Sequence, residues 1–99
     1  MNKRNIMKAI PTVQIDNEFV KVTEWCFPPN SATGMHIHAM DYVVVPMISG
    51  TLTIESKDNK FTEADLIVGQ SYSRNAGVHH NVINRNECEF RFIEIELKK

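Results

Sequence analysis

Two stretches decide the fold class and the chemistry of this chain: residues 34–50 read GMHIHAMDYVVVPMISG, and residues 69–84 read GQSYSRNAGVHHNVIN. Together they contain all four histidines and all four glycines of the 99-residue chain. Glycine supplies the backbone conformations that tight turns need, so its confinement to these stretches suggests turns that enclose one site.

The rest of the chain is patterned as short strands separated by turns. Strand-forming residues recur between turn signals about 8–12 residues apart, and no stretch has the apolar period of a helix. The candidate strands cover residues 12–15, 18–27, 42–48, 51–56, 61–68, 71–74, 78–84 and 89–97. We therefore expect an all-β sandwich or barrel, formed as a single domain over residues 1–99. The last strand carries apolar residues on both of its faces, so the pattern does not decide which face points inward.

Composition excludes several classes of function. Eleven basic and twelve acidic residues give a net charge of −1, which argues against a broad nucleic-acid or membrane surface. No apolar run approaches the roughly 20 residues of a membrane span, and residues 1–13 lack a signal-peptide pattern. We expect a cytoplasmic protein, with Cys26 and Cys88 present as reduced thiols.

The histidines form two pairs whose spacing suits a metal ion. His36 and His38 are two residues apart, so on a strand both imidazoles point to the same face. Two imidazoles on one face can bind one ion at about 2 Å. His79 and His80 are adjacent and point to opposite faces of a strand, so only one of them can join the first pair. In isolation, an HxH motif is equally compatible with solvated surface histidines.

With these motifs the sequence resembles the cupin family. The second cupin motif, G-x5-P-x-G-x2-H-x3-N, matches from Gly69 to Asn84, with Gly77 and His80 in register. Asn75 stands where proline is usual. The resemblance covers about half of the chain and implies a double-stranded β-helix, a jelly-roll type of β-barrel.

The first cupin motif, G-x5-H-x-H-x3,4-E-x6-G, matches less completely. His36, His38 and Gly50 agree with it, and 18 residues separate Gly50 from Gly69, close to the spacing of small single-domain cupins. The usual glutamate position holds Val43, so that acidic ligand is absent.

The resemblance implies one divalent transition metal held by His36, His38 and His80. Three imidazoles leave coordination positions open for water or substrate. Iron, manganese, nickel and zinc all suit such a site, and the sequence does not choose among them. Asp41 is the candidate fourth ligand, or alternatively a turn residue bonded to nearby backbone.

The motif alignment also implies which residues line the pocket. Val43, Val45 and Met47 share the parity of the missing glutamate, and Val82 shares that of His80. Tyr42 has the opposite parity and belongs either to the core or to the rim.

Tyr72 and Arg74 share a face of the segment before the second motif. They either stand at the pocket mouth, with Arg74 pairing a substrate carboxylate, or form a packed phenol beside a solvated guanidinium.

Two classes of function follow. The first is a metal-dependent enzyme of the dioxygenase, isomerase or lyase type acting on a small polar molecule, with Asp41 or Tyr42 as acid–base candidates. The second is a non-catalytic barrel that binds a small molecule with or without metal. A fold shared with cupins does not decide between them. The resemblance also implies a homodimer, which would cover apolar surface.

Overall fold

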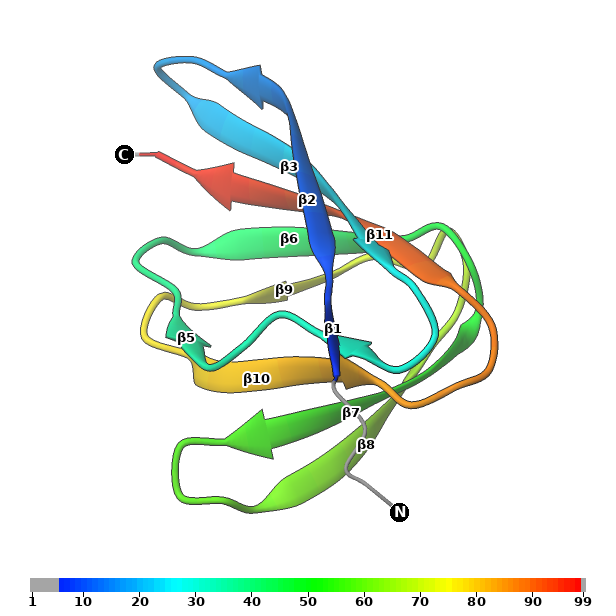
Figure 1. Cartoon of the computed structure of the whole chain (residues 1–99). Helices are drawn as coiled ribbons and strands as arrows, with labels where there is room; N and C mark the ends of the chain where they lie inside the picture. The colour runs from blue at the N-terminus through cyan, green and yellow to red at the C-terminus, as the bar shows by residue number, and fades with distance from the viewer. Residues whose placement is uncertain (1–5, 99) are drawn as a thin grey trace.

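The computed structural model describes residues 6–98, and all regular structure in this range is β (Figure 1). The strands are β1 (Met7–Lys8), β2 (Ile10–Asp16), β3 (Val20–Phe27), β4 (Ser31–Ala32), β5 (His36–Ile37), β6 (Tyr42–Pro46), β7 (Gly50–Ser56), β8 (Phe61–Leu66), β9 (Tyr72–Arg74), β10 (His79–Asn84) and β11 (Phe90–Leu97). The sequence predicted eight candidate strands; the three additional strands are β1, β4 and β5, which have only two residues each. The first five residues of the stretch tested for a signal peptide lie outside the described residues.

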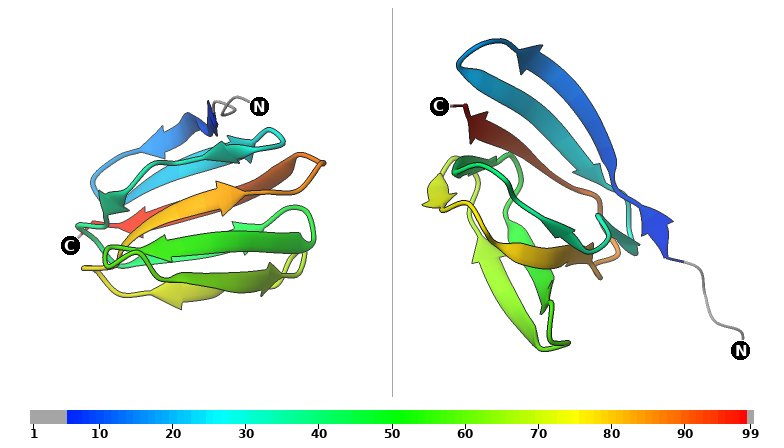
Figure 2. Two further views of the ribbon diagram at one scale, coloured as in Figure 1. Left: turned by 60° about the horizontal axis from the view of Figure 1, so that its bottom comes forward. Right: turned by 90° about the vertical axis from the view of Figure 1, so that its left-hand side faces the viewer.

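The strands of residues 6–98 form two sheets that face each other (Figure 2). One sheet has the order β1-β4-β10-β7-β8, with β5 also paired to β10, and the other has the order β2-β3-β11-β6-β9. The chain crosses between the sheets after β1, β3, β5, β6, β8, β9 and β10. All strand pairs are antiparallel except β1 with β4. The all-β prediction is confirmed.

The core fills one end of the space between the sheets. Phe27 and Phe90 are fully buried there, and the Phe27 and Phe92 rings lie 5.4 Å apart. Asn84, the last residue of the second motif, is also fully buried, and its side-chain amide donates to the carbonyl oxygens of Phe27 and Cys88. This asparagine therefore ties two turns together at the closed end of the barrel, a structural role that needs no ligand.

Strand β11 resolves the open question of its inward face. Phe90, Phe92 and Glu94 are buried, whereas the residues between them are only partly buried. A carboxylate is therefore carried into the interior on the same face as two phenylalanines, because alternate residues of a strand share a face.

Strand β6 inverts the parity that the motif alignment implied. Tyr42, Val44 and Pro46 are buried, whereas Val43 and Val45 are only half-buried and Met47 is 46% exposed. The reason is the break between β5 and β6: residues 38–41 form a turn, so the alternation does not carry across it. The prediction that Val43, Val45 and Met47 face the interior was therefore wrong.

The outer edge of the second sheet is formed by β2, whose residues are all exposed. Cys26 and Cys88 are free thiols. Among residues 6–98, no helix has the length and apolar character needed to cross a membrane.

Candidate metal centre

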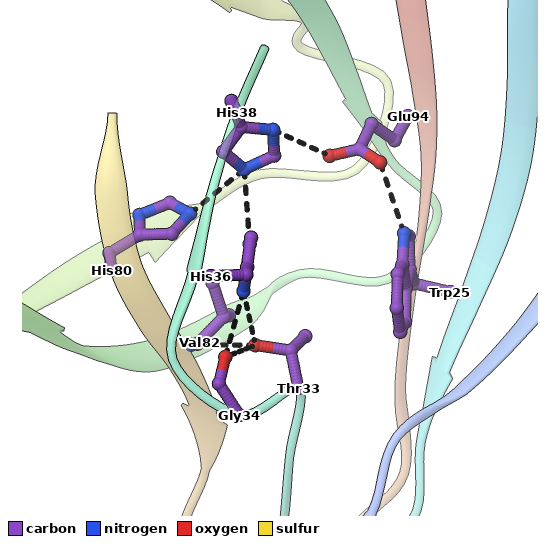
Figure 3. A network of polar contacts seen from close by, with 8 residues as sticks. All are labelled: Trp25, Thr33, Gly34, His36, His38, His80, Val82 and Glu94. Carbon is purple, nitrogen blue, oxygen red and sulfur yellow. Dashed lines mark hydrogen bonds and ion pairs between the residues drawn. The ribbon is translucent and has the colours of Figure 1, made fainter. Parts of the chain in front are cut away.

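Three histidine side chains from the two motifs converge at one point between the sheets (Figure 3). Nε2 of His38 lies 3.1 Å from Nε2 of His36 and 3.1 Å from Nε2 of His80. The candidate ligand atoms of all three residues lie within 4.8 Å of one another. Nitrogens bound to one ion at 2.0–2.1 Å would be separated by about 3.0–3.4 Å, so this spacing suits a shared ion.

His36 is oriented by the turn that precedes it. Its Nδ1 lies 2.7 Å from the carbonyl oxygen of Gly34, and because a carbonyl only accepts, the proton sits on Nδ1. The Thr33 hydroxyl donates to the same carbonyl and accepts from the backbone N–H of Val82. Gly34 has a φ of 91°, a conformation that side chains disfavour, so glycine is required for this turn. The turn therefore fixes a tautomer in which Nε2 keeps its lone pair.

His38 is held between a phenol ring and a carboxylate. The ring of Tyr42 stacks on the imidazole with centroids 4.0 Å apart. On the other side, Oε2 of Glu94 lies 3.7 Å from Nδ1 of His38, and Trp25 Nε1 donates to Oε1 of Glu94 at 3.2 Å (Figure 3). Burial raises the pKa of Glu94, an effect that the Trp25 hydrogen bond opposes.

His80 is positioned by the backbone of β10, which is paired on both sides. Burial, together with the neighbouring His36, lowers the pKa of His80 to about 3. The same two causes lower the pKa of His38 to about 4. Both rings are therefore neutral at pH 7, the state in which imidazole binds metal. Nδ1 of His80 is buried without a hydrogen-bond partner among residues 6–98.

The protons of the three rings cannot satisfy both close contacts in the neutral state. Because the His36 proton is on Nδ1, the contact between Nε2 of His36 and Nε2 of His38 can be a hydrogen bond only if His38 carries its proton on Nε2. That single proton cannot also point at Nε2 of His80. That tautomer would also aim a lone pair of His38 Nδ1 at Glu94. A cation accepting all three Nε2 lone pairs removes both conflicts, so the donor set fits a metal ion.

The histidines stand at the side of a cavity of about 690 Å³ between the sheets. Its lining includes four of the predicted pocket residues, which are Tyr42, Tyr72, Arg74 and Val82. Val43, Val45 and Met47 are not part of the lining, in agreement with the inverted parity of β6.

Asp41 and His79 lie apart from the convergent ligand atoms. Neither belongs to the histidine cluster or to the cavity lining. Oδ1 of Asp41 instead accepts from the backbone N–H of Ala76 at 2.7 Å. This hydrogen bond connects the turn that follows β9 to the start of β6, the strand with which β9 pairs. The structure thus brings together His36, His38 and His80 and leaves out the aspartate that the sequence offered as a fourth ligand.

Glu94 is the acidic group of the site that sequence reasoning missed. Nine residues separate it from the second motif and it comes from the opposite sheet, so no motif spacing points to it. The available signal was weak: it shares a face of its strand with Phe90 and Phe92, which is unusual for a solvated carboxylate.

Residues 23–96 match the family model described as a cupin domain. The chain belongs to the cupin family. Beta-alanine degradation protein BauB of Pseudomonas aeruginosa is 52% identical to this cupin over 91 residues, which cover 92% of this chain and 95% of that protein.

Solved cupin structures show the same fold. A cupin domain from Bordetella pertussis is 55% identical, with a TM-score of 0.94, and the match covers 98% of this chain and 100% of that one. An RmlC-like cupin with a double-stranded β-helix fold from Methanocaldococcus jannaschii has a TM-score of 0.75 at 15% identity, covering 99% and 87% of the two chains. The predicted double-stranded β-helix is therefore confirmed.

Proposed function

We propose that this cupin binds one divalent transition-metal ion through Nε2 of His36, His38 and His80 and acts as a metal-dependent enzyme on a small carboxylate-bearing molecule. The convergence of the three nitrogens beside a cavity is the observation that carries the proposal. Such an ion supplies Lewis-acid or oxygen-activating chemistry when bound.

The chain's own residues hold and orient the reacting partners. The Gly34 carbonyl fixes the tautomer of His36, and the Glu94 carboxylate faces Nδ1 of His38. Tyr42 keeps its proton, because burial raises its pKa to about 12, and it braces His38 by stacking. Arg74 lines the cavity and offers a guanidinium to a carboxylate.

The Pseudomonas aeruginosa relative is named a beta-alanine degradation protein, which supports a role in the breakdown of a small carboxylic acid. The metal identity stays open among iron, manganese, nickel and zinc, because three imidazoles suit all of them.

Elemental analysis of untagged protein, purified without chelator, tests the proposal directly. Wild type should hold close to one equivalent of a transition metal, and His38→Ala should hold none. No metal in wild type, even after reconstitution, would contradict a metal-dependent function. If the protein holds metal but turns over none of the tested acids, the result would favour the alternative that it is a non-catalytic barrel that binds a small molecule.

We also propose a homodimer. The support is the exposed apolar surface of the β2 edge, where Ile10 and Ile15 are each about half exposed, at 52% and 47%. Light scattering should give twice the chain mass for wild type and a single chain for Ile10→Glu. A monomeric wild type would contradict the proposal.

A further inference from the structure

We propose that the ligand of this site is a monocarboxylate with an apolar chain, whose carboxylate lies at the histidine cluster and Arg74 and whose chain lies on an apolar floor. This inference rests on the proposed function for the ion. It adds the chemical class of the ligand and the residues that select it.

The cavity changes from polar to apolar along its strands. One step of two residues, about 6.6 Å, leads from His80 to Val82 on β10 and from Tyr42 to Val44 on β6. On β11 the same step leads from Glu94 to Phe92. Because all these residues line the cavity, each of the three strands passes from a polar side chain to an apolar one. The β6–β11 ladder pairs Val44 with Glu94, so in this sheet the polar and apolar groups overlap by one level before Phe92 continues the apolar part. A ligand that matches this change has a polar head and an apolar body.

The floor of the cavity offers little to a polar ligand. We define the floor by its aliphatic and aromatic lining side chains from five strands, which are Val44, Leu52, Ile54, Leu66, Val82 and Phe92. Polar lining residues such as Thr23, Gln70 and Ser71 lie outside this set. A polar group placed against them would lose its water without gaining a hydrogen bond. A methylene chain placed there gains the full benefit of burial. The cavity, at about 690 Å³, also has room for a ligand larger than a three-carbon acid.

Arg74 is positioned to receive the carboxylate. It pairs with Tyr42 across the β9–β6 ladder, so both side chains stand on the same face, and Tyr42 stacks on His38. The described part of the chain contains no ion pair to Arg74. A guanidinium in a cavity, next to the histidines and without a carboxylate of its own, is complementary to a carboxylate brought by the ligand.

The charge of the histidine cluster also favours an anion. The three convergent side chains are imidazoles, with no carboxylate among them, so a bound divalent ion would have no anionic ligand among these residues. A monocarboxylate would supply one.

Binding of straight-chain carboxylates to zinc-loaded wild type tests the inference. Calorimetry would measure acetate, butanoate, hexanoate and octanoate, and fluorescence of Trp25, the single tryptophan and a lining residue, would report entry into the cavity. Affinity should rise roughly three- to fourfold per methylene. An affinity independent of chain length would overturn the inference.

Two pairs of variants separate the head from the chain. Ala64→Phe fills the cavity and should weaken octanoate binding roughly tenfold or more while sparing acetate; Glu63→Phe, on the exposed face of the same strand, should change neither. Arg74→Gln should weaken hexanoate roughly tenfold or more and leave hexanol unchanged, with Arg85→Gln as the control. Equal losses for hexanoate and hexanol would overturn the role of Arg74.

Zinc content measured on the same samples separates the two proposals. One equivalent of zinc with no dependence on chain length would sink this inference and leave the proposed function standing. Wild type that binds no zinc would overturn the proposed function and, with it, the placement of the carboxylate. Should Ala64→Phe fail to fold, the wild-type series decides alone.

Discussion

The two segments that carry the histidines hold them by different means. His80 stands in β10, a six-residue strand bonded to β7 on one side and to β4 and β5 on the other. His36 and His38 stand in or beside the two-residue β5, which is bonded to β10 and runs into a turn. Backbone pairing therefore positions His80, whereas contacts at Nδ1, from Gly34 and Glu94, position the other two. The geometry of the site therefore depends on Gly34 and Glu94, which match no position of the two cupin motifs, as well as on the motif residues.

Removing the imidazole of His80, the histidine that is positioned by strand pairing, should have the largest effect on metal affinity. We predict that His80→Ala weakens metal binding by at least about 100-fold, because only two imidazoles then remain. His79→Ala is the matched control: it changes the adjacent residue of the same strand, which lies outside the cluster, and should bind as wild type. Competition with a chromogenic chelator measures both. Equal losses in the two variants would contradict the assignment of His80.

Removing the charge that faces His38 should have a smaller effect. Glu94→Gln keeps the shape and the acceptor for Trp25 but loses the carboxylate, so we predict metal binding about 10- to 100-fold weaker. Glu96→Gln, two residues along the same face, should change affinity less than about threefold. If the two variants behave alike, the contact between Glu94 and His38 has no part in holding the metal.

Lowering the pH should destabilise the metal-free protein, because two of its histidines are buried. The unfolded chain binds protons below about pH 6.5, whereas the native pKa values of His38 and His80 are about 4 and about 3. Below about pH 6.5 the unfolded state therefore holds more protons, and metal-free protein loses stability as the pH falls. We predict that His80→Gln lowers this slope by about 1.4 kcal/mol per pH unit. Urea denaturation in chelator between pH 6 and pH 4.5 measures it, and an unchanged slope would mean that His80 is not protected in the native protein.

The smallest effect should come from Asp41. Its Oδ1 accepts from the backbone of Ala76 and lies outside the histidine cluster. Asp41→Asn retains that oxygen, so we predict metal affinity within about threefold of wild type in the same chelator assay. A loss as large as that of His80→Ala would restore Asp41 as a fourth ligand.

The same contrast explains what the sequence could predict. On β10 the alternation runs unbroken, so once the second motif assigned His80 to the site, the placement of Val82 on the same face followed from spacing. Between His38 and Tyr42 the strand is interrupted, and parity counted across a turn placed Val43 rather than Val44 inside. The fold class was predictable because turn signals and motifs are recognised from residues that lie near one another in the sequence.

Glu94 and the cavity were beyond the sequence for a different reason. The contact between Glu94 and His38 joins residues 56 positions apart, on strands of opposite sheets, and depends on which face of β11 turns inward. Both faces of β11 carry apolar residues, so the pattern alone did not decide which one turns inward. The apolar floor likewise draws on five strands and exists only once the two sheets are packed together.

A crystal structure of the metal-loaded protein, with anomalous scattering recorded at the metal edge, tests the central claim most directly. We predict a single peak at about 2.0–2.2 Å from Nε2 of His36, His38 and His80, with Nδ1 of His38 facing Glu94. A peak bound by other residues, or no peak between the three imidazoles at full metal loading, would contradict the account.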